Sequence, residues 1–215
     1  MKFWSKHMKR EFRNFKIVRT CDKEYKDYHR YKQHLKTDFH SRCAYCNLLD
    51  TQVTTPYEID HYIPKNVFKN VWPELETHYD NLIYACKKCN RAKSDQYDGE
   101  IENRIIENKL FYDPVLVDYN TIFYRNDIGG ISSDDTKGRS MINNLKLYRP
   151  IHNLAWICEI VKNTIDHINI KIQEVGEDSE KGKLLLEAKN SLNIYYVDCR
   201  DIFIANYNND EFTMN

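Results

Sequence analysis

The sequence predicts an α+β fold in which a small strand, loop, strand and helix core precedes a mostly helical C-terminal half. Two Cys-x-x-Cys pairs, Cys43 with Cys46 and Cys86 with Cys89, enclose two apolar runs of strand length. The second pair opens a Lys- and Arg-rich segment without Gly or Pro, which favours a helix. From about residue 136 onward, apolar residues recur at helical spacing through three stretches.

The composition is that of an ordinary globular protein, because 41% of the 215 residues are hydrophobic and 30% are charged. This length allows one hydrophobic core, or a small catalytic module with a helical extension. No run approaches the roughly 20 apolar residues of a membrane span, and the N-terminus lacks the apolar stretch of a signal peptide. The seven cysteines are an odd number, which argues against a complete disulfide framework. We therefore expect a cytoplasmic protein, not associated with a membrane, in which paired cysteines bind metal.

The charge is unevenly distributed although its formal sum is zero. Residues 1–42 contain 13 Lys and Arg but only 5 Asp and Glu, so the remainder of the chain is acidic. A basic segment of this kind is suited to a phosphate backbone. It is equally suited to pairing with the acidic part of the same chain.

The expected elements follow from periodicity and turn residues. Residues 1–20 are expected to form an arm or a short strand, and an amphipathic helix is expected over about 22–39. Strands are expected near 53–63 and 82–85, and a helix after the second cysteine pair. A short helical piece near 101–110 and a β-rich stretch follow, and three helices are expected near 136–147, 151–174 and 178–206. We divide the chain into a basic arm and helix (1–42), a catalytic core (43–98), and a C-terminal region (99–215) that stabilises the core or binds a partner.

The two cysteine pairs predict a structural zinc site. Thirty-nine residues separate the pairs in a chain expected to be cytoplasmic, and four thiolates suit tetrahedral Zn²⁺. The ligands would be Cys43, Cys46, Cys86 and Cys89. The remaining cysteines lie outside this pattern and are interpreted as small apolar residues.

Polar residues of several types surround the cysteine pairs. The segment Glu58-Ile59-Asp60-His61-Tyr62-Ile63-Pro64-Lys65 lies between them, Asn81 precedes the second pair, and Asn90, Arg91 and Lys93 follow it. This order of CxxC, IDHxIPK and NLxxxCxxCNRxKSD closely resembles the HNH endonucleases of the ββα-metal group, in the variant where Asn replaces the last His. The resemblance covers about a quarter of the chain. It implies a ββα-metal core and hydrolysis of phosphodiester bonds in DNA.

The same resemblance implies roles for individual residues. His61 would be the general base, since histidine can take a proton from water at neutral pH. Asp60 and Asn90 would supply oxygen ligands to a catalytic Mg²⁺ (or Mn²⁺), which prefers few protein ligands. Asn81 would orient His61 through its side-chain amide.

Two further expectations concern geometry. Strand alternation sends the side chains of Asp60 and His61 to opposite faces, so they converge only where the strand bends, and Pro64 fits such a bend. Lys93 follows Asn90 by three residues and would lie on nearly the same helix face, so we expect it, rather than Arg91, to contact phosphate.

A weaker resemblance continues beyond the motif. Gly130-Ile131, Thr136-Lys137-Gly138-Arg139 and Leu145-Lys146-Leu147-Tyr148-Arg149-Pro150 are similar to the region after the motif in stand-alone bacterial HNH proteins. This layout resembles the HNH component, PtuB, of Septu-type anti-phage systems and the nuclease effectors of some retron systems. It implies an ATPase partner similar to PtuA.

Two alternatives stay open at this point. The chain could be a restriction or homing nuclease that acts alone. It could also be a non-catalytic zinc module that binds nucleic acid or protein, because each polar residue taken singly has an ordinary structural explanation. His61 would then be a surface histidine, Asn81 a turn residue, Asn90 a helix cap and Lys93 an exposed charge.

Overall fold

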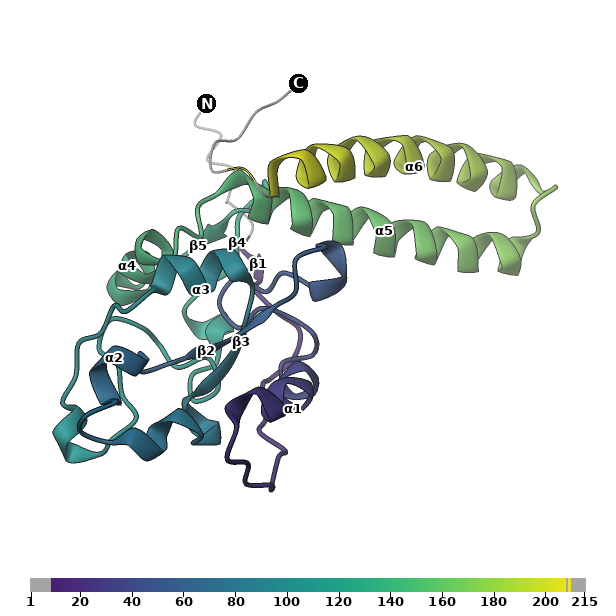
Figure 1. The fold of residues 1–215 in the computed structure, drawn as a ribbon. Helices are drawn as coiled ribbons and strands as arrows, with labels where there is room; N and C mark the ends of the chain where they lie inside the picture. The colour runs from purple at the N-terminus through teal and green to yellow at the C-terminus, as the bar shows by residue number, and fades with distance from the viewer. Residues whose placement is uncertain (1–8, 208, 210–215) are drawn as a thin grey trace, which may run out of the picture. The chain divides into compact units, whose positions relative to one another are not determined.

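The computed structural model describes residues 9–207 and 209, which form two compact units (Figure 1). The first unit extends to Arg149 and the second begins at Pro150. The segment boundaries expected at residues 42 and 98 both fall inside the first unit. Residues 1–8 of the predicted basic arm lie outside the described residues.

The first unit is built around an antiparallel hairpin followed by a helix. Strand β2 (Glu58–His61) pairs with β3 (Leu82–Ala85), and helix α3 (Lys87–Lys93) follows β3 directly. The predicted order of strand, loop, strand and helix is confirmed, although β2 is shorter than the expected 53–63. The connection between the strands contains the short helix α2 (Lys65–Phe68) and two 3-10 turns, Pro73–Glu76 and Tyr79–Asn81.

The two faces of the hairpin contact different elements. Antiparallel partners share a face, and residues two apart on a strand share a face. Asp60 therefore lies on the face that α3 covers, because Lys93 of α3 donates to its carboxylate. His61 and Tyr84 lie on the opposite face, since Tyr84 pairs with Ile59 in the register of the sheet. Helix α1 (Lys32–Asp38) packs on β3.

The N-terminal helical segment is shorter than the predicted 22–39. It consists of a 3-10 helix (Tyr28–Tyr31) that runs into α1. Asp27 has an extended backbone and its side chain accepts a hydrogen bond from the His29 N–H, so it caps the helix. This cap explains why the helix begins at residue 28.

A second, three-stranded sheet has the order β1–β4–β5, with β1 at Arg10–Glu11, β4 at Tyr124–Arg125 and β5 at Ile131–Ser132. The expected β-rich stretch near 111–132 thus supplies only two strands of two residues. Much of the backbone around them is held by side chains: Asn126 Oδ1 accepts from the N–H groups of Ile128 and Gly130. The helical piece expected near 101–110 is a single 3-10 turn at Ile101–Asn103, and another 3-10 turn spans Tyr119–Thr121.

The three C-terminal helices are confirmed. Helix α4 spans Thr136–Asn144, α5 spans Pro150–Val175 and α6 spans Glu180–Tyr207. Helices α5 and α6 form an antiparallel pair (Figure 1) and are the regular structure among the described residues of the second unit. Val161 and Ile165, two of the apolar residues at helical spacing in α5, are buried. No helix in the described ranges combines the length and the apolar character that a membrane span requires.

Two buried arginines, Arg125 in β4 and Arg13 two residues after β1, connect this region to the first cysteine pair. Arg13 donates to the carbonyl of Ala44 at 2.7 Å, and Arg125 donates to the carbonyl of Cys46 at 3.0 Å and to that of Gly129 at 2.9 Å. Burial lowers the pKa of Arg13 to about 10, which leaves it charged at neutral pH. These guanidinium groups satisfy carbonyls that would otherwise be buried without a donor.

We therefore expect Arg125→Ala to destabilise the first unit by about 1 to 3 kcal/mol, the usual cost of leaving a buried polar group unpaired. Chemical denaturation of the full chain measures this change. Arg91→Ala is the matched control, since Arg91 is exposed on α3, and it should change the free energy of unfolding by less than about 0.5 kcal/mol. Equal stability of the two variants would contradict the bracing role of Arg125.

Candidate metal and catalytic site

The four cysteines of the two pairs converge into one buried cluster. Their sulfur atoms all lie within 4.8 Å of one another, and the Cys46 and Cys86 sulfurs are 3.9 Å apart. In the described part of the chain this is the one group of three or more His, Cys, Asp or Glu side chains with metal-ligand spacing. Cys86 also caps α3, because its sulfur accepts from the Cys89 N–H at 3.4 Å. The cluster therefore fixes the start of the helix.

The chemistry of this cluster fits zinc. A Zn–S bond of about 2.3 Å in a tetrahedron separates neighbouring sulfurs by about 3.8 Å, close to the distance between Cys46 and Cys86. Burial opposes ionisation of Cys43, but hydrogen bonds from the other three thiols hold its pKa well below the ordinary value, whereas the pKa of Cys46 is raised by burial and that of Cys89 by hydrogen bonds with the neighbouring cysteines. A thiolate at Cys43 is the form that binds metal. Zn²⁺ held by these residues would join the segment before β2 to the start of α3.

His61 ends strand β2 with its imidazole held in one orientation. Nε2 lies 2.9 Å from the backbone carbonyl oxygen of Glu76. A carbonyl only accepts, so Nε2 carries the proton and donates, and Nδ1 keeps its lone pair. Rings of Tyr28 and Phe68 flank the imidazole at centroid distances of 4.8 and 5.6 Å. Burial lowers the pKa of His61, so the ring is neutral at neutral pH and able to accept a proton.

Asn81 is fully buried, and its side chain hydrogen-bonds to backbone groups rather than to the His61 side chain. Its Oδ1 accepts from the backbone N–H of Ile63 at 2.8 Å, and its Nδ2 donates to the carbonyls of Ile63 and Leu75. We expected the Asn81 amide to orient His61. In the structure this amide instead hydrogen-bonds to the backbone of Ile63, two residues after His61. Asn81 therefore fixes the chain as it leaves β2, two residues after His61.

Asp60 is buried on the opposite face of β2, and both of its oxygens are engaged. Oδ2 accepts from the Tyr45 hydroxyl at 2.6 Å and Oδ1 accepts from Lys93 Nζ at 2.9 Å. Burial raises the pKa of Asp60, and the nearby Lys93 charge opposes that rise. The expected convergence of Asp60 and His61 on one face is not seen. The two side chains lie on opposite faces at the same end of β2.

Lys93 lies where the sequence did not place it. Its side chain is fully buried, and Nζ also donates to the carbonyl of His61 at 2.7 Å. The expectation of an exposed phosphate contact is not met, because the helix turns Lys93 toward β2 rather than toward solvent. Arg91, expected to be the weaker candidate, is exposed on α3.

Asn90 lies beside an acidic residue that the sequence reasoning missed. Its Nδ2 donates to Glu58 Oε2 at 2.7 Å, and Glu58 shares the α3 face of β2 with Asp60. The side chains of Asp60, Asn90 and Glu58 thus offer carboxylate and amide oxygens between β2 and α3. Such oxygens are the ligands that Mg²⁺ prefers, and each carboxylate oxygen has a second lone pair beyond its present hydrogen bond. The donor set fits a divalent cation.

Two contacts at this site carried little signal in the sequence, whereas a third could have been found there. Tyr45 sits inside the first cysteine pair, and only the fold brings its hydroxyl to Asp60. Glu76 contributes a backbone carbonyl, which no side-chain pattern could indicate. Glu58 was visible at two residues before Asp60, and strand alternation would have placed both on one face.

Comparison with known proteins points to the segment that contains the candidate site. Residues 43–96 match the HNH endonuclease family, and this range includes both cysteine pairs and every catalytic residue predicted from the motif. A 62-residue stretch is 29% identical to the Septu protein PtuB of Bacillus thuringiensis. That alignment covers 29% of this chain and 22% of the PtuB sequence. A search of solved structures found no match. The resemblance to HNH endonucleases, with four cysteines that fit zinc knuckles, is confirmed.

The cluster predicts that zinc removal unfolds the first unit. Structural zinc binding contributes on the order of 10 kcal/mol, which is comparable with the whole stability of a typical domain. Cys86→Ser should therefore lose bound zinc and the cooperative thermal transition of this unit, as measured by metal analysis and circular dichroism. Cys21→Ser is the control, since Cys21 lies outside the cluster. Unchanged thermal stability after complete zinc removal would contradict the prediction.

Proposed function

We propose that this chain is a metal-dependent endonuclease that hydrolyses phosphodiester bonds of DNA. The HNH family match supports nuclease activity in general. The observation that carries the proposal is the end of strand β2, where a neutral, oriented His61 directly follows the buried carboxylate of Asp60, which Lys93 holds on the same face as Glu58. A base on one side and hard oxygen ligands on the other are what hydrolysis of a phosphodiester requires.

The proposed proton acceptor is Nδ1 of His61. The carbonyl of Glu76 holds the proton on Nε2 and fixes the plane of the ring, so a water beside Nδ1 can lose its proton as it attacks phosphorus. The contacts of Asn81 with Ile63 and Leu75 keep the chain after His61 in place. The imidazole therefore needs no reorganisation before the reaction.

The proposed cation ligands are Asp60 and Asn90, with Glu58 as a third oxygen donor. Mg²⁺ or Mn²⁺ held there would supply Lewis-acid stabilisation of the charge on the phosphate and on the leaving oxygen. Tyr45 and Lys93 hold the Asp60 carboxylate by hydrogen bonds of 2.6 and 2.9 Å. We assign Lys93 to the positioning of Asp60 and to neutralising its charge rather than to phosphate binding.

The first test is cleavage of plasmid DNA by the zinc-loaded protein with magnesium, manganese or a chelator. The wild type should nick the plasmid only with the divalent cation, and His61→Ala should reduce the rate by about 100-fold or more, the contribution of a general base. His167→Ala is the matched control, because His167 is exposed on α5, and it should cleave at the wild-type rate.

Both proteins need the same zinc content and thermal stability for this comparison. Equal cleavage by His61→Ala and the wild type would exclude the assigned base. A different result is that the wild type and His61→Ala bind nucleic acid equally well and cleave it under no condition, even when an ATPase partner is added. That result would favour a non-catalytic zinc module.

A second prediction concerns Tyr45. Tyr45→Phe removes the hydroxyl that donates to Asp60 and leaves the neighbouring cysteines intact. We expect about 10- to 100-fold lower activity, the usual effect of losing a group that orients a metal ligand, with unchanged zinc content. The loss should be smaller at high magnesium concentration. Tyr148→Phe, an exposed tyrosine, should have no effect, and full activity of Tyr45→Phe would show that Asp60 needs no such support.

We also propose a role in anti-phage defence, with an ATPase as partner. The similarity to the Septu protein PtuB supports this proposal, although the alignment is confined to about the length of the HNH segment. The helical second unit exposes apolar side chains that a partner could cover, among them Ile170, Leu184 and Ile194. Co-purification with the product of a neighbouring ATPase gene tests the proposal. A nuclease that is fully active alone, with no such neighbour, would instead fit the restriction or homing alternative.

A further inference from the structure

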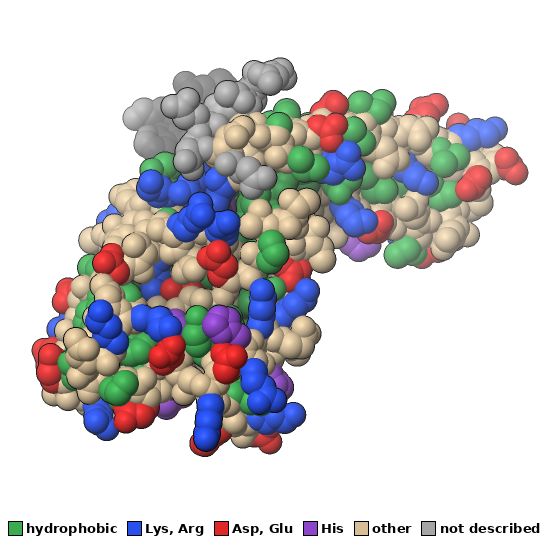
Figure 2. All heavy atoms as spheres, in the orientation of Figure 1, with side chains coloured by type: hydrophobic (Ala, Val, Ile, Leu, Met, Phe, Trp, Pro, Cys, Tyr) green, Lys and Arg blue, Asp and Glu red, His purple; other side chains and the backbone are tan. Residues whose placement is uncertain are grey.

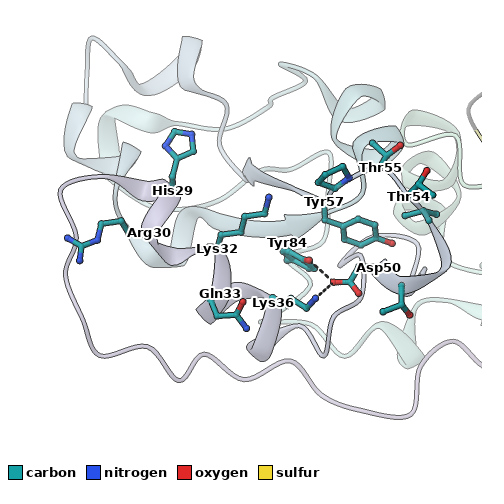
Figure 3. Close-up of a pocket in the computed structure, with 13 residues that line it drawn as sticks. His29, Arg30, Lys32, Gln33, Lys36, Asp50, Thr54, Thr55, Tyr57 and Tyr84 are labelled. Atoms are coloured by element: carbon teal, nitrogen blue, oxygen red, sulfur yellow. Dashed lines mark hydrogen bonds and ion pairs between the residues drawn. The ribbon is translucent and has the colours of Figure 1, made fainter.

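A cavity of about 580 Å³ lies between the N-terminal helical segment and the loop that precedes β2 (Figure 3). One wall is formed by residues 29–36 and the other by residues 50–57. The buried rings of Tyr57 and Tyr84 form its floor, with centroids 5.2 Å apart. The volume lies within the range of about 300 to 1,000 Å³ that is usual for sites that bind small organic groups.

The floor is fixed by hydrogen bonds within the protein. The Tyr84 hydroxyl donates to Asp50 Oδ2 at 2.8 Å, and Lys36 Nζ lies 2.9 Å from the same oxygen. The Tyr57 hydroxyl donates to the carbonyl of Leu48 at 2.7 Å. Asp50 is the one carboxylate among the lining residues, and the ion pair with Lys36 offsets its charge. The acidic component of the cavity is therefore neutralised.

The wall adds positive charge and hydrogen-bond donors. Lys32 extends from α1 into the space between His29 and Tyr57 (Figure 3). Its side chain is exposed, and no acidic group of residues 9–207 or 209 forms an ion pair with it. Exposed Thr51 and Thr54 supply hydroxyls from the opposite wall. A lysine facing hydroxyl donors suits a phosphate group.

The position of the cavity connects it to the catalytic histidine. Tyr84 lies on the same face of the hairpin as His61, because its strand partner Ile59 is two residues from His61. On the other wall, the His29 ring stacks on Tyr28 at 4.0 Å, and Tyr28 contacts the His61 ring at 4.8 Å. A single side chain thus separates the cavity lining from the proposed base.

Figure 2 shows Lys and Arg side chains in several separate groups on one face, with Asp and Glu side chains between some of them. Lys32, which forms no ion pair with the acidic groups of residues 9–207 and 209, is distinguished from them by its place in a preformed cavity.

Resting on the proposed nuclease function, we propose that this cavity is a subsite for the DNA strand next to the scissile phosphate, where Lys32 neutralises a backbone phosphate. The strand would run from His61 past Tyr28 to the space between α1 and the 50–57 loop. Each neutralised phosphate contributes about 0.7 to the salt slope of single-strand binding. The subsite therefore predicts a measurable change in salt dependence.

The test is binding of a fluorescently labelled single-stranded DNA oligonucleotide by the zinc-loaded full chain, measured by anisotropy in magnesium-free buffer over a range of salt concentrations. Lys32→Gln should raise Kd about tenfold, as expected for one charge-assisted contact, and should lower the salt slope by about 0.7. Lys32→Glu should weaken binding further. Lys183→Gln and Lys183→Glu are the controls, since Lys183 is exposed on α6 and gives the same changes in charge.

Three outcomes overturn the subsite: no binding of the oligonucleotide by the wild type, an unchanged Kd in the Lys32 variants, or equal effects of the Lys32 and Lys183 variants. Plasmid cleavage separates this inference from the nuclease proposal. A wild-type protein that binds DNA through Lys32 but has no His61-dependent cleavage would retain the subsite and refute the nuclease. His61-dependent cleavage combined with wild-type DNA binding by the Lys32 variants would retain the nuclease and refute the subsite.

Discussion

The convergence of four buried thiols is the constraint on which the catalytic region depends. The cysteine pairs belong to segments about 40 residues apart, yet their sulfurs lie within 4.8 Å of one another. Because Cys86 also caps α3, the cluster fixes the helix that carries Asn90 and Lys93. The loop of the first pair carries Tyr45, whose hydroxyl reaches Asp60. The cysteine cluster takes no part in the proposed reaction, but it positions Tyr45, Asn90 and Lys93 at the proposed metal site.

Asp60 and His61 are neighbours on strand β2, although the proposed reaction needs both near one phosphate. Consecutive residues on a strand point to opposite faces, so the side chains of Asp60 and His61 leave β2 in opposite directions. The fold places α3 on the face of Asp60 and the Tyr28 region on the face of His61. The proposed base and the proposed cation ligands thus lie on either side of the strand end, where a phosphate could contact both.

Burying Lys93 is the least expected feature of the site. A buried charge is costly unless it is paired and hydrogen-bonded, and here Asp60 and the carbonyl of His61 satisfy it. The same ion pair holds the Asp60 carboxylate in a defined orientation. Replacing Lys93 would leave that carboxylate buried with one donor fewer, so Lys93 contributes to both stability and the geometry of the site.

The sequence alone determined the residue types, their order and their local structure. Cysteine spacing, the strand-length runs and the helical segment at the second cysteine pair depend on short-range patterns, and the structure contains each of them. The helix begins at Lys87, inside the second pair, rather than after Cys89, and it ends at Lys93. Only the tertiary structure decided which side chains meet. Asn81 contacts the backbone at Ile63 instead of His61, and Lys93 turns inward, because these contacts depend on how α3 and the connecting loop pack against β2. Distances between segments far apart in the chain leave no periodic signal in the sequence.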